Sequence, residues 1–260
     1  MKKKSKIALA VVAGAIILPS AYVYLKQTGK LSTGNLPRYK AKKVEELPEA
    51  SLKNKRIIFL GSSVTYGSAA GGESFVDYMV KRDGIVAYKE AVSGTTLVEE
   101  NVMGRKSYVE RLRFIDKNFP ADAFICQLST NDASLKKPLG RVNESFAKES
   151  FDTKTVAGAI EYIIAYVKET WNCPVLFYTG TKYPSAEYEA MIDLLYQVQK
   201  KWGIGIIDLW NDEEMNAVSE KDYARYMVNG IHPSKAGYLL WWTPKMEEKL
   251  VKYLKEENTL

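Results

Sequence analysis

Residues 56–67 read RIIFLGSSVTYG, an apolar run that ends in two serines placed between two glycines. Its β-branched and aromatic residues predict a buried strand over residues 56–61. Glycine permits a sharp turn or a close approach of another group to the backbone, so a serine held here is a candidate nucleophile. By itself the stretch is more typical of an ordinary strand-to-helix loop with a serine N-cap. The partners of a nucleophile must therefore be sought elsewhere in the chain.

Four further apolar runs follow, at residues 85–92, 123–129, 174–180 and 204–210. Helical periodicity separates them, most clearly over residues 154–171, and another helix is expected after Pro233. Near-continuous apolar strands that alternate with helices predict an α/β fold with a parallel sheet covered on both faces. Ligands of such sheets bind beyond the carboxyl ends of the strands. We therefore expect residues 61–67, 93–94 and 129–132 to meet at one edge.

Composition predicts one folded domain, residues 56–260, with an N-terminal appendage. The 260 residues are 46% hydrophobic, enough for one substantial core. The net charge of +6 is unevenly distributed along the chain. Residues 1–56 contain 13 Lys and Arg and 3 Glu, whereas residues 57–260 contain 24 Lys and Arg and 28 Asp and Glu. The domain itself is thus slightly acidic and shows no basic, aromatic-rich cluster, so we predict no nucleic-acid partner.

The N-terminus predicts a membrane anchor. MKKKSK precedes IALAVVAGAIILPSAYVYL, residues 7–25, which carry no charge over 19 positions. At 1.5 Å per residue this length just crosses a hydrocarbon core of about 30 Å. The lysines should remain cytoplasmic, which places the rest of the chain outside. A cleaved signal peptide, giving a secreted protein, is the alternative; Pro19 makes cleavage after Ala21 unfavourable, so residues 1–25 favour an uncleaved anchor.

Residues 26–55 are polar, rich in lysine and interrupted by glycine and proline. They show no sustained apolar period. We expect a polar tether, partly ordered where it meets the domain.

A single histidine, His232, lies in VNGIHPSKAGY, just before the expected last helix. A lone histidine is more often structural than catalytic. A serine hydroxyl, however, is a weak nucleophile that needs a base within hydrogen-bond reach, and this imidazole is the one candidate in the sequence. The pattern leads to the hypothesis of a Ser–His pair.

Four short blocks, FLGSSVTYG, AVSGTT, LSTND and NGIHPSKAGY, occur in an order and spacing that resemble the signature blocks of the SGNH, or GDSL-type, esterases and lipases. The resemblance extends over about residues 56–254. It implies a flavodoxin-like three-layer α/β/α sandwich around a five-stranded parallel sheet. It also implies ester hydrolysis through an acyl-enzyme.

Matched to these blocks, Ser63 would be the nucleophile and His232 the general base. The oxyanion hole would consist of the backbone N–H of Ser63, the backbone N–H of Gly94 and the side-chain amide of Asn131. Loss of one such donor typically costs about 100-fold to 1,000-fold in rate.

The chain departs from the family pattern at three positions. Ser62 stands where the family usually has Asp, and Ser129 where its third block begins with Gly. Asn229, three residues before His232, stands where the triad has Asp, which orients the imidazole and stabilises the imidazolium. Asparagine can accept the Nδ1 hydrogen but carries no charge and can flip. We expect a working, slower dyad with Asn229 as a weak orienter; Asp208 is an alternative carboxylate or a structural turn residue.

Export on a tether suggests an acetyl or other short-chain ester of an envelope glycan, wall polymer or lipid as substrate. The long connection 133–151 is expected to form a wall or lid, and its four basic residues face either an anionic polymer or solvent: Lys136, Lys137, Arg141 and Lys148. Tyr183 is a candidate platform for a sugar ring or a plain surface residue. The alternative function is a glycan-binding pseudoenzyme or an acyltransferase with the same fold.

No cofactor or metal is predicted. We expect Cys126 and Cys173 to be small buried hydrophobic residues and not metal ligands. The sequence contains no glycine-rich phosphate loop. The sequence does not predict an oligomeric state.

Overall fold

The computed structural model describes residues 23–26, 28–100, 102, 104–257 and 259–260. The predicted anchor, residues 7–25, lies outside these residues except for its last three positions. Within the described part of the chain, no helix has both the length and the apolar character needed to span a bilayer.

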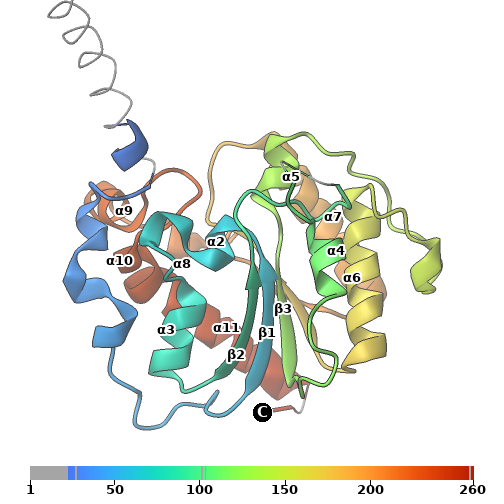
Figure 1. Cartoon of the computed structure of the whole chain (residues 1–260), viewed down its shortest axis with the longest axis horizontal. Helices are drawn as coiled ribbons and strands as arrows, with labels where there is room; N and C mark the ends of the chain where they lie inside the picture. The colour runs from blue at the N-terminus through green and yellow to red at the C-terminus, as the bar shows by residue number, and fades with distance from the viewer. Residues whose placement is uncertain (1–22, 27, 101, 103, 258) are drawn as a thin grey trace, which may run out of the picture.

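Five parallel strands form one sheet in the order β2-β1-β3-β4-β5 (Figure 1). This order is that of flavodoxin-like sheets, so the predicted sheet is confirmed. The strands are β1 Arg56–Gly61, β2 Val86–Ala91, β3 Ala123–Gln127, β4 Val175–Tyr178 and β5 Gly205–Ile207. Except for β1, they end before the apolar runs do, and the residues beyond them form the loops at the carboxyl edge.

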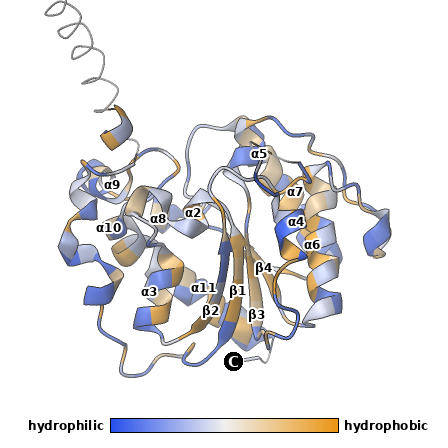
Figure 2. Ribbon diagram, in the orientation of Figure 1, coloured by the Kyte–Doolittle hydropathy of each residue, from blue (hydrophilic) through white to orange (hydrophobic). Residues whose placement is uncertain are grey.

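Helices cover both faces of the sheet and complete the expected three layers. Helices α4 (Tyr108–Leu112), α6 (Val156–Thr170) and α7 (Ala186–Trp202) enclose one core, and α3 (Phe75–Arg82) and α11 (Thr243–Glu256) enclose the other. Successive side chains of β1 point to opposite faces of the sheet and pack in different cores. Ile58 and Leu60 lie in the first core, and Ile57 and Phe59 lie in the second. The central strands are therefore hydrophobic in Figure 2, whereas the edge strand β2 is more hydrophilic.

The α-helices are short near the site and long on the sheet faces. They are α2 Ser63–Tyr66, α3 Phe75–Arg82, α4 Tyr108–Leu112, α5 Thr130–Ser134, α6 Val156–Thr170, α7 Ala186–Trp202, α8 Glu213–Asn216, α9 Glu220–Tyr226, α10 Lys235–Gly237 and α11 Thr243–Glu256. A π-helical turn, Tyr238–Trp242, joins α10 to α11.

Residues 28–55 are packed on the domain, so this segment is more ordered than the partly ordered tether that the sequence predicts. Three 3₁₀ turns, Thr33–Asn35, Pro37–Tyr39 and Ala41–Lys43, follow one another along the surface. Ala41 and Leu52 are buried in the same core as α3 and α11. Tyr39 is buried, and its carbonyl accepts a hydrogen bond from the Tyr78 hydroxyl at 2.6 Å. The segment lacks an apolar period because it is anchored by a few separate residues instead of by one helical face.

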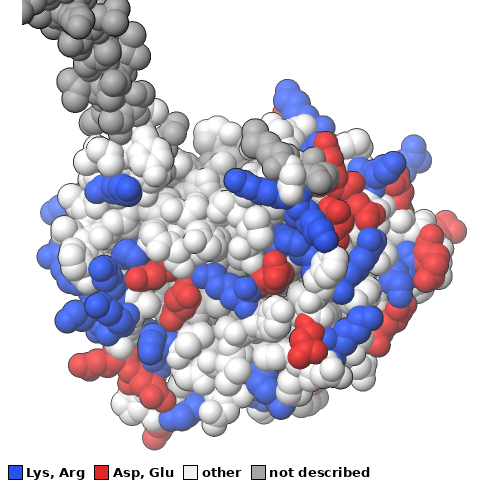
Figure 3. Space-filling model, viewed as in Figure 1, with Lys and Arg blue, Asp and Glu red and all other residues white. Residues whose placement is uncertain are grey.

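The connection 133–151 does not form the expected wall or lid over Ser63. It crosses α6 and α7, where Phe146 packs on Trp202 at a ring distance of 4.9 Å and the Asn143 N–H donates to Glu161. Three of its four basic residues pair with carboxylates, in the pairs Lys136–Glu187, Lys137–Glu100 and Lys148–Glu169. Acidic and basic side chains are accordingly interspersed over the right-hand part of Figure 3.

Candidate active site

The turn after β1 presents Ser63 at the carboxyl edge of the sheet. Gly61 ends the strand, and a Cβ there would lie 1.8 Å from Thr65 Oγ1, so no larger residue fits. Ser63 begins α2, and Gly67 ends it with φ of 85°, a left-handed conformation that favours glycine. The two glycines of the opening stretch thus permit a tight strand-to-helix turn. Ser63 is 7% exposed.

His232 reaches Ser63 from a loop 169 residues further along the chain. Its Nε2 lies 2.8 Å from Ser63 Oγ. The loop is closed by a bridge between Met227 and Pro233 and by the Val228 N–H, which donates to the His232 carbonyl at 2.9 Å. Burial lowers the pKa of His232 below its ordinary value, so the imidazole is neutral at neutral pH. A neutral imidazole in this contact can take the serine proton.

Asn229 orients the imidazole in the place where a triad carboxylate stands. Its Oδ1 lies 3.0 Å from His232 Nδ1 and accepts the backbone N–H groups of Ile231 at 3.0 Å and His232 at 2.9 Å. Two backbone donors require an acceptor, which opposes the flip that would present the amide NH₂. The Nδ1 proton therefore faces Asn229, and the Nε2 lone pair faces Ser63.

The loop after β2 and helix α5 hold the two other predicted oxyanion-hole residues. Gly94 adopts a left-handed conformation with φ of 80°. Asn131 Nδ2 donates to the Thr95 carbonyl at 2.8 Å, which fixes its side chain against the Gly94 loop. Because an amide NH₂ carries two hydrogens, the second remains for a ligand. Ser129, a departure from the family pattern, caps α5 by accepting the N–H groups of Asn131 and Asp132.

Buried polar residues that the sequence did not single out lock these loops together. Arg111 donates to the Gly61 carbonyl at 2.8 Å and to Thr95 Oγ1 at 3.0 Å, and pairs with Glu90 at 2.9 Å. Gln127 Oε1 accepts the Ser62 N–H at 2.9 Å. These contacts join the nucleophile turn to the Gly94 loop and to β3. No local pattern marks either residue, since their partners lie far away in the sequence.

Asp132 is the supporting residue that a sequence signal could have revealed, because it completes the block LSTND. Its carboxylate accepts the N–H groups of Leu97 at 2.7 Å and Val98 at 3.2 Å. Burial raises the pKa of Asp132 to about 6, against the opposing effect of its hydrogen bonds. Asp132 thus ties the loop that contains Gly94 to the helix that contains Asn131.

Other candidate residues take no part in the Ser63–His232 contact. Asp208 is a structural residue, which accepts hydrogen bonds from Thr179, Tyr196 and the backbone of its own loop. Ser62 is fully buried, and its hydroxyl has no partner among the described residues. Tyr183 is not a plain surface residue, because its ring packs against those of Tyr188 and Trp210, which also contact each other. A role as a platform for a sugar ring stays a prediction.

Cys126 and Cys173 are buried free thiols, as predicted. Across the described ranges, no group of three or more His, Cys, Asp or Glu side chains has an arrangement that could hold a metal ion.

A doubly wound sheet whose carboxyl edge holds a serine in contact with an oriented histidine defines a hydrolase of the Ser–His type. Residues 59–240 match the model of the GDSL-like lipase/acylhydrolase family, and the chain belongs to that family. This confirms the resemblance found in the four sequence blocks. Comparison with curated protein sequences gives no match.

Several solved structures share the fold. A Lactobacillus plantarum protein is 21% identical with a TM-score of 0.61, over 78% of this chain and 98% of that one. The lipase/acylhydrolase of Enterococcus faecalis is 19% identical with a TM-score of 0.52, over 78% and 96%. The aryl esterase of M. smegmatis is 15% identical with a TM-score of 0.52, over 76% and 99%. At these identities the likeness concerns the fold alone.

Proposed function

We propose that the protein is a serine ester hydrolase that acts through an acyl-enzyme on Ser63. The observation that carries the proposal is the continuous chain of contacts from Ser63 Oγ to His232 at 2.8 Å and from His232 to Asn229 at 3.0 Å. Such a chain provides a nucleophile, a base and an orienting group, which are the parts that covalent acyl transfer needs.

The reaction proceeds in two stages. Ser63 Oγ bonds to the ester carbonyl carbon while its proton passes to His232 Nε2. The carbon–oxygen bond to the alcohol then breaks, and the imidazolium returns the proton to the leaving oxygen. Water, deprotonated by the same imidazole, attacks the acyl-enzyme and releases the acid and Ser63. Each stage passes through an oxyanion, which the N–H groups of Ser63 and Gly94 and the Asn131 amide stabilise.

Asn229 gives this site a weaker electrostatic support than a carboxylate would. The imidazolium formed during attack faces an amide oxygen, which is a dipole and not a full charge. Orientation, however, is complete, because three N–H groups converge on the same oxygen. We therefore expect activity with a chemical step slower than that of a site with an aspartate.

The proposed setting is the outer side of a membrane. The uncharged residues 7–25 behind MKKKSK support an anchor, and the ordered segment 28–55 would hold the domain close to it. The proposed substrates are then short acyl esters of envelope glycans, wall polymers or lipids. A glycan-binding pseudoenzyme is less well supported, since binding alone requires no serine within 2.8 Å of an imidazole.

The test is hydrolysis of p-nitrophenyl acetate by the full chain in mild detergent. We expect Ser63→Ala and His232→Ala each to lose at least about 1,000-fold in kcat, in line with losses of single triad members. Ser68→Ala, in the same loop but outside the Ser–His contact, is the matched control and should keep wild-type activity. Retention of activity by Ser63→Ala would contradict the proposed nucleophile.

A further inference from the structure

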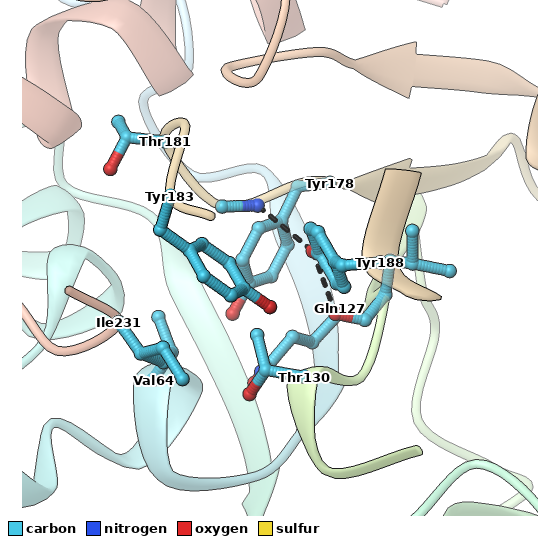
Figure 4. Close-up of a pocket in the computed structure, with 10 residues that line it drawn as sticks. Val64, Gln127, Thr130, Tyr178, Thr181, Tyr183, Tyr188 and Ile231 are labelled. Atoms are coloured by element: carbon cyan, nitrogen blue, oxygen red, sulfur yellow. Dashed lines mark hydrogen bonds between the residues drawn. The ribbon is translucent and has the colours of Figure 1, made fainter. Parts of the chain in front are cut away.

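A small cavity lies beside the residues that the mechanism uses. Its lining includes the residue after Ser63, the residue before Asn131 and the residue before His232, which are Val64, Thr130 and Ile231. Three catalytic segments each contribute an immediate neighbour to this lining, which brings the cavity close to the Ser63–His232 contact. Figure 4 shows these side chains together with the tyrosines that form the remaining wall.

The cavity is small and its deeper wall is rigid. The space open to the centre of a water molecule is about 10 Å³, which is about the room for one water. Leu128, Tyr178 and Tyr188 in its lining are each at most 1% exposed. Tyr188 is fixed further, since its hydroxyl accepts the Gly180 N–H at 3.0 Å and donates to the Leu128 carbonyl at 3.1 Å. This wall cannot move without breaking hydrogen bonds inside the core.

Tyr183 is a wall residue that is only partly buried. It lies in the loop after β4, with its ring 5.4 Å from that of Tyr188 and 5.3 Å from that of Trp210. The Tyr183 Cβ lies 3.7 Å from the position that a Cβ would take at Gly230, so Tyr183 borders the His232 loop. In Figure 4 its ring extends toward the centre of the lining residues.

Two polar groups of the lining lack partners. The Tyr183 hydroxyl and Gln127 Nε2 are buried and make no hydrogen bond with any described residue. Gln127 is 1% exposed, and its Oε1 already binds the nucleophile turn. Any acyl group that enters this space keeps both groups from a hydrogen bond, at a cost of about 1–3 kcal/mol for each, so the size of the space and not its polarity discriminates between chain lengths.

We propose that this cavity receives the acyl part of the ester, that it admits an acetyl group and rejects longer chains, and that Tyr183 sets the limit. The inference rests on the proposed function and names its substrate class, an acetyl ester. The alcohol must face solvent because it has to depart after His232 protonates it. The enclosed space therefore suits the acyl group, and its size fits a single methyl.

The experiment compares kcat/KM for p-nitrophenyl acetate, propionate, butyrate and hexanoate with full-length wild type, Tyr183→Ala and Tyr183→Phe. One methylene in a fitted pocket changes kcat/KM by about 10-fold to 200-fold. Wild type should therefore prefer acetate over butyrate by at least about 10-fold. Tyr183→Ala should raise the butyrate-to-acetate ratio by at least about 10-fold. Tyr183→Phe keeps the ring and is the matched control, with a ratio within about 3-fold of wild type.

The outcomes separate this inference from the proposed function. Hydrolysis of acetate with equal rates on longer chains, or an unchanged ratio in Tyr183→Ala, overturns the inference alone. Methyl benzoate has a large acyl group and a small alcohol, whereas phenyl acetate has the reverse. A wild-type preference for methyl benzoate would show that the cavity holds the alcohol, and this result also overturns the inference. Absence of hydrolysis for every ester together with no reaction of Ser63 overturns the proposed function itself. Thermal unfolding of each variant shows that the ratios come from folded protein, and Tyr183→Leu replaces the alanine variant if that one does not fold.

Discussion

At the scale of single residues, the distinctive feature is an asparagine that does the orienting work of a carboxylate. Asn229 Oδ1 gathers two backbone N–H groups and the imidazole Nδ1 within 3.0 Å. The two backbone contacts fix which end of the amide faces His232. The amide therefore selects the productive tautomer without adding a negative charge. An aspartate would both orient the imidazole and supply a negative charge, whereas Asn229 only orients it.

Asn229→Asp tests this separation through pH dependence. In the wild type, burial lowers the pKa of His232, so kcat/KM should begin to fall only below the ordinary histidine value of about 6.5. A carboxylate favours the charged imidazolium and raises that pKa, so the acidic limb of the profile should move to higher pH. Above this limb kcat should equal or exceed the wild-type value. A limb that moves to lower pH would contradict the assignment.

Asn229→Ala should be the damaging change, since it leaves three N–H groups without their acceptor. A hydrogen bond to a group that becomes charged is worth about 1.5–3 kcal/mol, so kcat should fall by about 10-fold to 150-fold. The measurement is kcat at the pH plateau. A fall confined to KM, with kcat unchanged, would show that Asn229 serves binding and not the base.

At the scale of elements, the packed N-terminal segment connects the two halves of the Ser–His contact. Asn35 donates to the Ala69 carbonyl at 2.8 Å, in the loop after the nucleophile helix. Its Oδ1 accepts the Lys235 N–H at 2.8 Å, just after the His232 loop. Glu73 adds a second connection, because its Oε2 accepts the Ala41 N–H at 3.0 Å and pairs with Lys235 at 3.0 Å. The segment thus braces the loops that align Ser63 with His232.

Asn35→Ala should weaken this brace. Three partly buried hydrogen bonds are lost. Each is worth about 1 kcal/mol, so the free energy of unfolding should fall by about 2–4 kcal/mol. We expect kcat to fall by about 3-fold to 10-fold at a temperature where the variant is fully folded, because misalignment of reacting groups slows chemistry. Asn118→Ala, on an exposed loop, is the matched control. Wild-type kcat and stability in Asn35→Ala would refute the bracing role.

Local patterns predicted the elements well but not the contacts between them. The strand at residues 56–61 matches β1, because a buried strand needs a continuous apolar run that is visible in the sequence. The serine, histidine and asparagine blocks were visible for the same local reason. The role of Asn35 was not visible, since it depends on Lys235, 200 residues away. Tyr183 was visible as a candidate, but its packing against Tyr188 and Trp210 was not. The connection 133–151 was misjudged because its length does not show which helices it crosses.

At the scale of the whole molecule, the charge distribution and the proposed anchor support a proposal for the orientation of the chain. Basic residues are concentrated in residues 1–56, whereas residues 57–260 have a slight acidic excess. Lysines before an apolar span stay on the cytoplasmic side, so we propose that the domain faces outward.

A cysteine-accessibility experiment tests this orientation. Cys126 and Cys173 are buried and should not react with a membrane-impermeant maleimide. Glu144→Cys, at an exposed position of the domain, should react in intact spheroplasts. Lys4→Cys should react only after lysis. Reaction of both variants only after lysis would refute the outward orientation.

The central claim, that Ser63 is a nucleophile activated by His232, is tested most directly by covalent labelling. The full-length protein is treated with a fluorophosphonate, and the modified peptide is identified by mass spectrometry. We expect one adduct, on Ser63, formed at the wild-type rate in Ser68→Ala and at least about 100-fold more slowly in His232→Ala. An adduct on another serine, or labelling of Ser63 that does not depend on His232, would contradict it.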